Sequence, residues 1–146
     1  MTFDGQPIYL NPGDDGFRTK RNGSYVDKTG MITLINERID TTGKHICICR
    51  PRRFGKSTAA QMLAAYYGCG QDTSELFENL RIEEEPSYRK YLNQYNVLYL
   101  DITSFMSDAE IKREEFIAEI DRRVFEEVKE AWPEVRIASS LGDTLA

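Results

Sequence analysis

Residues His45–Thr58 read HICICRPRRFGKST, and the prediction of the fold starts from this segment. Its first five residues are almost all apolar and include two isoleucines, which is typical of a strand buried on both faces of a parallel sheet. The next nine residues carry four cations and end in a glycine, a lysine and two hydroxyl residues. From Lys56 to Tyr67 the chain is apolar almost all round before Gly68, so we predict a buried helix there.

A loop between a strand and a helix can bind phosphate when it meets three requirements. A glycine must let backbone N–H groups approach the phosphate oxygens, and a helix N-terminus must point at the anion. A lysine must reach the β- and γ-phosphates, and a hydroxyl must hold Mg²⁺. Gly55, Lys56 and Ser57 stand in this order. A basic surface turn is the alternative, but it does not account for the two buried elements beside the loop.

The sequence therefore predicts a site for ATP and Mg²⁺. Lys56 is the candidate catalytic residue, because its ammonium group would neutralise charge that develops on the γ-phosphate. Ser57 is the candidate ligand of Mg²⁺. The predicted nucleotide-binding residues are Arg53, Phe54, Gly55, Lys56, Ser57 and Thr58.

The opening of the loop departs from the general pattern GxxxxGK[ST], the Walker A motif. That pattern requires glycine at position 50, where this chain has Arg50, and Pro51 has no N–H to offer. We therefore expect only the amides from about Arg53 onward to surround the phosphate. The side chains of Arg52 and Arg53 either contact phosphate or remain solvated, and the sequence leaves both readings open.

Periodicity predicts the remaining elements. Apolar residues at helical spacing predict a helix at about 29–39, and Val97–Ile102 reads as a second core strand. A long helix follows, with an apolar stripe of Phe116, Ile117, Ile120, Val124 and Val128, and it ends before Pro133. Strands that alternate with helices predict an α/β fold of the P-loop NTPase type, a parallel sheet flanked by helices.

Composition narrows the class of ligand. The 146 residues are 40% hydrophobic and 29% charged, with a net charge of −5. A local group of cations in an acidic chain favours a small anion and gives no indication of nucleic acid. No apolar run is long enough to span a bilayer, and the N-terminus lacks the pattern of a secretory signal, so we expect a cytoplasmic protein without a membrane partner.

The three cysteines do not indicate a metal site. Their number is odd, they form no CxxC pair, and the chain has a single histidine, so zinc binding is excluded. Cys47 and Cys49 alternate along the predicted strand. We expect them to be buried free thiols, as is usual for cysteine in a core.

Four segments together resemble a known family. They are YVDKT at 25–29, RPRRFGKST at 50–58, LFENLRI at 76–82 and VLYLDIT at 97–103. Over residues 17–105 the chain closely resembles the bacterial "predicted AAA-ATPase" family, which is related to archaeal-type and STAND ATPases. The resemblance implies that Arg50 is the family's own version of the loop. It also implies that Asp27, Lys28 and Thr29 lie near the nucleotide, although a helix cap explains Asp27 or Thr29 equally well.

Asp101 has two interpretations. It follows four apolar residues as a Walker B aspartate does, which would make it a Mg²⁺ ligand. The resemblance implies instead that the Mg²⁺-supporting acids lie on a later strand that ends in Asp-Glu, and no such motif follows residue 105. Asp101 would then close a core strand near the nucleotide.

The missing acids also predict that the chain is the N-terminal part of a longer domain. In that layout residues 1–24 are an irregular lead-in and residues 25–146 are the nucleotide-binding core. The first functional hypothesis is an ATP-binding module of an ATPase; whether this chain alone hydrolyses ATP stays open. The second is a nucleotide-gated interaction module, or a remnant, that binds ATP without hydrolysis. Its partners would be the nucleotide and either a second copy or a downstream domain.

Overall fold

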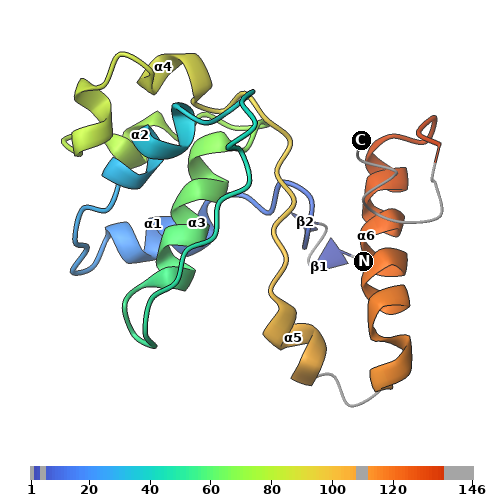
Figure 1. Ribbon diagram of the computed structural model, residues 1–146. Coiled ribbons are helices and arrows are strands. Elements are labelled where there is room, and N and C mark those ends of the chain that lie inside the picture. Colours follow the sequence, from blue (N-terminus) through green and yellow to red (C-terminus); the bar gives the residue numbers. More distant parts are fainter. Residues whose placement is uncertain (1, 4–5, 108–111, 137–146) are drawn as a thin grey trace. The chain divides into compact units, whose positions relative to one another are not determined.

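The computed structural model describes residues 2–3, 6–107 and 112–136, and the chain divides into two compact units (Figure 1). Residues 13–97 form one unit, which contains the predicted site and is called the loop unit below. Residues 1–12 and 98–146 form the other, called the terminal unit.

The loop unit is helical. Its elements are α1 (Asp15–Arg21), α2 (Gly30–Asn36), α3 (Lys56–Tyr67), α4 (Tyr88–Tyr91) and two 3-10 helices, η1 (Ser74–Phe77) and η2 (Arg81–Glu84). The core forms around α3, where Met62 and Tyr66 are fully buried and pack with Phe17 of α1 and Ile32 of α2. Helix α1 was not anticipated, because its segment is rich in turn-forming residues.

Helix α3 confirms the prediction from the sequence, because it begins directly after Gly55 and ends directly before Gly68. Its C-terminal carbonyl groups find a partner in Asn93, whose side-chain amide donates to the carbonyl oxygen of Gly68 at 2.9 Å. The same amide donates to the hydroxyl of Thr73 at 2.9 Å, and the Asn93 backbone N–H donates to the carbonyl oxygen of Tyr66 at 2.8 Å. These bonds satisfy groups that a helix end leaves without partners.

A buried polar network joins three helices of the loop unit. The Tyr67 hydroxyl donates to Oδ1 of Asn36 at 2.6 Å, and Nδ2 of Asn36 donates to the Ser87 hydroxyl at 3.1 Å. The Tyr66 hydroxyl donates to the carbonyl oxygen of Tyr88 at 2.7 Å. Because buried polar groups are costly without partners, this network favours one arrangement of α2, α3 and α4.

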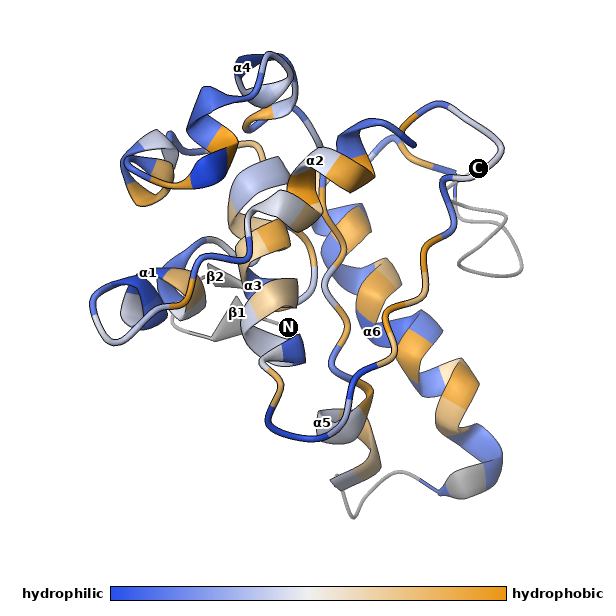
Figure 2. Ribbon diagram, turned by 60° about the vertical axis from the view of Figure 1, so that its left-hand side comes forward, coloured by the Kyte–Doolittle hydropathy of each residue, from blue (hydrophilic) through white to orange (hydrophobic). Residues whose placement is uncertain are grey.

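The terminal unit packs around one long helix. Its elements are β1 (Thr2–Phe3), β2 (Gln6–Pro7), α5 (Ile102–Ser107), η3 (Arg113–Glu115) and α6 (Phe116–Ala131). The strands β1 and β2 pair antiparallel, with Thr2 opposite Pro7. Hydropathy alternates around α6 (Figure 2), and Ile120, Val124 and Val128 are buried with Tyr9 and Phe105.

One buried carboxylate of α6 holds the N-terminal segment. The Glu127 side chain accepts hydrogen bonds from the backbone N–H groups of Ile8 and Tyr9, each at 2.7 Å, and of Leu10 at 2.9 Å. Glu127 is only 3% exposed. Three donors compensate the cost of removing a carboxylate from water.

The predicted parallel sheet is not formed, and this prediction was wrong. Among the described residues the only sheet is the antiparallel pair β1–β2, and residues 45–49 form neither strand nor helix. Val97–Ile102 is not a core strand either, because it makes a single antiparallel bridge, Leu10 with Leu98, before α5 begins. A buried strand needs a hydrogen-bonded neighbour on each side, and no described segment pairs with residues 45–49.

Two helix predictions also need adjustment. Helix α2 is shorter than predicted and ends at Asn36, so Ile39 lies beyond it. In α6 the end before Pro133 is confirmed, but Ile117 is 69% exposed and does not belong to the buried stripe. The buried stripe is Ile120, Val124, Glu127 and Val128, with Phe116 packed against it one turn before Ile120.

Candidate functional site: a cationic cavity at the start of α3

The loop before α3 has an unusual backbone. Gly55 precedes the helix with φ of +78°, and Arg53 has φ of +68°. Residues 51–54 form a tight turn, in which the N–H of Phe54 donates to the carbonyl oxygen of Pro51 at 3.4 Å. Glycine adopts this left-handed conformation without cost, whereas a residue such as Arg53 is strained in it, and such strain gathers at functional loops.

The first amides of α3 are available to a ligand. The N–H of Ala59 makes the first helical hydrogen bond, to the carbonyl oxygen of Gly55 at 2.9 Å. The N–H groups of Lys56, Ser57 and Thr58 come before it, and no side chain of the described residues caps this end. Uncapped amides at the positive end of the helix dipole favour an anion.

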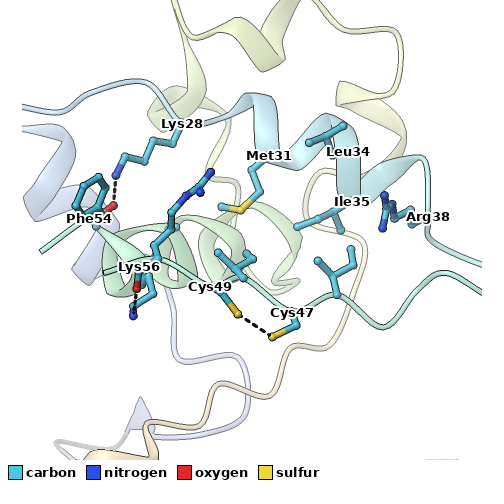
Figure 3. Close-up of a pocket in the computed structure, with 14 residues that line it drawn as sticks. Lys28, Met31, Leu34, Ile35, Arg38, Cys47, Cys49, Phe54 and Lys56 are labelled. Atoms are coloured by element: carbon cyan, nitrogen blue, oxygen red, sulfur yellow. Dashed lines mark hydrogen bonds between the residues drawn. The ribbon is translucent and has the colours of Figure 1, made fainter. Parts of the chain in front are cut away.

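Two lysines contact the loop from different directions (Figure 3). Nζ of Lys56 donates to the carbonyl oxygen of Arg50 at 2.6 Å, and Nζ of Lys28 donates to that of Phe54 at 2.6 Å. A Cβ atom added at Gly55 would overlap Nζ of Lys28. Glycine is therefore required at position 55 both for the backbone conformation and for the approach of Lys28.

A cavity of about 650 Å³ opens beside this loop, within the loop unit. Its walls come from α2, residues 46–50 and the start of α3 (Figure 3). Its charged lining residues are all cations, namely Lys28, Arg38, Arg50 and Lys56, and no described residue that lines it is a carboxylate. The volume is in the range of small-molecule sites. A cavity of this charge selects an anionic ligand.

The walls between the cations are apolar. They are formed by Met31, Leu34, Ile35, Ile46 and Ile48, with Phe54 and Ala59 toward the loop. Figure 3 shows the side chains of Met31 and Ile35 directed from α2 toward the segment that carries Cys47 and Cys49. The cavity therefore combines cationic and apolar lining, which suits a ligand with an anionic part and an apolar part.

The segment Tyr25–Thr29 connects the loop to η2. Asp27 accepts hydrogen bonds from the Thr29 hydroxyl at 2.7 Å, the Thr29 N–H at 2.8 Å and the Arg81 N–H at 2.9 Å. The fully buried Thr29 accepts a further bond from the Ile82 N–H at 3.1 Å. Burial raises the pKa of Asp27, but the hydrogen bonds from Arg81 and Thr29 outweigh it and leave the pKa below its usual value.

These contacts rule out the helix-cap interpretation of Asp27 and Thr29. Neither side chain caps α2; both bind the first amides of η2 instead, 53–54 residues further along the chain. Lys28 alone faces the loop. The sequence analysis named this segment but did not predict that Lys28 would point to the loop while Asp27 and Thr29 point to η2. Alternation of side chains along an extended segment is the signal that could have indicated it.

The remaining predicted site residues lie at the surface. Arg52, Arg53, Phe54 and Ser57 are exposed, and Thr58 is half-buried. Asp101 lies in the terminal unit, just before α5. Its carboxylate accepts from the Thr103 hydroxyl at 2.5 Å and from the Thr103 N–H at 2.9 Å, and the hydroxyl bond in particular lowers the pKa of Asp101. The described residues contain no group of three or more acidic, cysteine or histidine side chains arranged to hold a metal.

The prediction of buried thiols was wrong. Cys47 and Cys49 are exposed and line the cavity, and Cys69 is only half-buried. Their sulfur atoms are 3.7 Å apart, and this hydrogen-bonded contact raises the pKa of Cys47. The reason is the same as for the missing sheet, because no described segment covers residues 45–49.

Comparison with known proteins places the chain in a family. A family model described as "Predicted AAA-ATPase" matches residues 16–146, which include the loop, the Tyr25–Thr29 segment and most of both units. No curated protein and no solved structure matches the chain. No helix in the described part of the chain is long and apolar enough to cross a membrane. The match spans nearly the whole chain, which therefore belongs to the predicted AAA-ATPase family.

Proposed function

We propose that the loop unit binds ATP with Mg²⁺ at residues 50–58, as the nucleotide-binding part of an ATPase. The observation that carries this proposal is the cavity beside the start of α3, where every charged lining residue is a cation. The uncapped amides of the helix face the same region. Together with membership in the family, this charge pattern favours a nucleoside triphosphate over an uncharged metabolite.

The phosphates would lie at the loop end of the cavity. The amides of Arg53 and of Gly55 to Thr58 can donate to phosphate oxygens, and that of Phe54 could do so only by giving up its bond to the Pro51 carbonyl oxygen. The Lys56 ammonium group would leave the Arg50 carbonyl oxygen and donate to oxygens of the β- and γ-phosphates instead. The exposed Ser57 hydroxyl would be the ligand of Mg²⁺, which supplies electrostatic stabilisation of the phosphates when bound.

The base would lie along the apolar walls. Met31 and Ile35 of α2 line the cavity together with Ile46 and Ile48, and an aromatic base would gain from burial against them. The preference for adenine rests on the family.

The lining also bears on turnover. Phosphoryl transfer needs a placed metal and an oriented water, and no carboxylate of the described residues lines the cavity. This observation favours the second hypothesis for the 146-residue chain studied by itself. We therefore expect it to bind ATP but to hydrolyse it more slowly than about 1 s⁻¹, the low end of ordinary enzymes.

Titration calorimetry with MgATP tests binding directly. Lys56→Ala should weaken the affinity about tenfold or more, because a charge-assisted hydrogen bond to phosphate is lost. Lys20→Ala removes the same charge from an exposed side chain of α1 that does not line the cavity, and should leave the affinity unchanged. Equal affinities of the wild type and Lys56→Ala would show that the loop does not bind the phosphates.

A further inference from the structure

The Lys28 ammonium group lies directly over the glycine of the loop. It donates to the Phe54 carbonyl oxygen at 2.6 Å, and Cε of Lys28 would be 3.5 Å from a Cβ atom at Gly55. Lys28 lines the same cavity as Lys56 but comes from the segment before α2, so the two ammonium groups reach the loop from separate elements. None of the described residues that line the cavity is a carboxylate that would offset their charge.

The backbone around Lys28 is firmly anchored. On one side Asp27 binds the N–H of Arg81, and on the other the buried Thr29 binds the N–H of Ile82. The Lys28 N–H itself donates to the Tyr25 hydroxyl at 3.3 Å, and that hydroxyl donates to the sulfur of Met62 at 3.2 Å. The side chain therefore starts from a fixed point, which lowers the entropy lost when it holds a ligand.

We propose that Lys28 is a second phosphate-binding lysine of the site, which acts with Lys56 on the β- and γ-phosphates. This inference rests on the proposed binding of ATP. An ammonium group carries three N–H donors, so Lys28 can keep the Phe54 carbonyl and direct a second donor to a phosphate oxygen. It thereby holds the loop and the ligand together, and this explains why Gly55 leaves room for the Lys28 ammonium group.

The test compares nucleotides that differ only in phosphate number. ATP, ADP and AMP are titrated into the 146-residue chain and its variants Lys28→Met and Lys28→Arg, with AMP measured by competition against a fluorescent ATP analogue. Lys28→Met should lower the affinity for ATP about tenfold, the affinity for ADP less, and the affinity for AMP hardly at all, because AMP lacks the β- and γ-phosphates. Lys28→Arg keeps the charge and should recover part of the affinity. Lys20→Met is the matched control and should change none of the three.

The outcomes separate this inference from the proposed function. If Lys56→Ala lowers the affinity for ATP while Lys28→Met leaves it as unchanged as Lys20→Met does, Lys28 binds no phosphate and the proposed function stands. If Lys28→Met lowers the affinities for ATP, ADP and AMP equally and lowers the melting temperature, Lys28 only supports the loop and the inference is wrong. If the wild type binds no ATP, the proposed function and the inference fail together.

Discussion

At the scale of single residues, Gly55 meets two requirements at once. Its backbone is left-handed, and the space where a side chain would begin holds the Lys28 ammonium group. Gly43 faces neither requirement, because its φ is not left-handed and an added Cβ would find its nearest neighbour 3.6 Å away, at the Thr41 hydroxyl.

We predict that Gly55→Ala lowers the free energy of unfolding by about 1–2 kcal/mol, the cost of a left-handed conformation for an L-residue. It should also lower the affinity for ATP, because the new methyl group displaces the Lys28 ammonium group. Gly43→Ala is the control and should change stability by less than about 0.5 kcal/mol. Urea unfolding measures both. Equal stability of the two variants would contradict the left-handed strain at Gly55.

Asp27 is the second residue with a defined energetic role. Its carboxylate accepts three hydrogen bonds, and two elements meet there. Because its folded pKa is below the value in the unfolded chain, the carboxylate stabilises the fold above the unfolded pKa, and this stabilisation is lost as the pH falls through the folded pKa.

We predict that Asp27→Asn destabilises the chain at neutral pH, and that the difference from the wild type shrinks as the pH falls below about 4, near the pKa of an unfolded aspartate. Urea unfolding at several pH values measures this. Asp15→Asn removes the same charge from an exposed position in α1 and controls for net charge. A destabilisation by Asp27→Asn that stays constant down to pH of about 3 would show that ionisation of Asp27 does not matter.

At the scale of elements, α6 and residues 8–10 are joined by one side chain. Glu127 is buried on the same stripe as Val124 and Val128, where an apolar residue would be expected from the helical pattern. Its three amide donors explain the exception. The periodicity of the sequence could not identify them, since Ile8 is 119 residues away.

We predict that Glu127→Gln destabilises the terminal unit by about 2 kcal/mol, because an amide presents one acceptor and two N–H groups to three N–H donors. Hydrogen exchange should become faster at Ile8, Tyr9 and Leu10. Glu126→Gln is the control, because Glu126 is exposed and pairs with Arg122 on the surface at 2.5 Å. Its cost should stay below about 1 kcal/mol. Unchanged protection in Glu127→Gln would contradict the structural role of the carboxylate.

At the scale of the whole molecule, the loop unit leaves an extended apolar segment without a hydrogen-bonded neighbour. Within the described residues the backbone groups of residues 45–49 make no hydrogen bond, and Ile46 and Ile48 are 39% and 43% exposed. An extended segment with unpaired N–H and C=O groups is a template for another chain. A second copy of this chain carries a matching segment.

We predict that the chain self-associates through residues 45–49, so that its apparent mass by light scattering rises with concentration. Ile48→Lys should reduce association, because a charge on an open edge opposes pairing. Ile117→Lys is the control, since Ile117 is also exposed but lies on α6. A constant monomer mass, or an equal effect of both variants, would contradict association through this segment.

The sequence alone predicted helix α3, the glycine and lysine at its start, and the family. Helix α3 follows from signals within a few residues of one another, namely the helical spacing of apolar side chains and the glycines on either side of the helix. The family follows from four segments between residues 25 and 103. The roles of Lys56 and Ser57 in binding ATP and Mg²⁺ remain predictions.

Which groups from distant parts of the chain meet could be seen only in the folded structure. An apolar alternation marks residues 45–49 as suited to a strand, but a strand forms only when another segment supplies hydrogen bonds, and none of the described residues does. The position of Lys28 over Gly55 and the bond from Ile82 to Thr29 depend likewise on residues far apart in the chain. Local patterns report what a segment can form; the hydrogen-bonding partner that realises it lies elsewhere in the sequence.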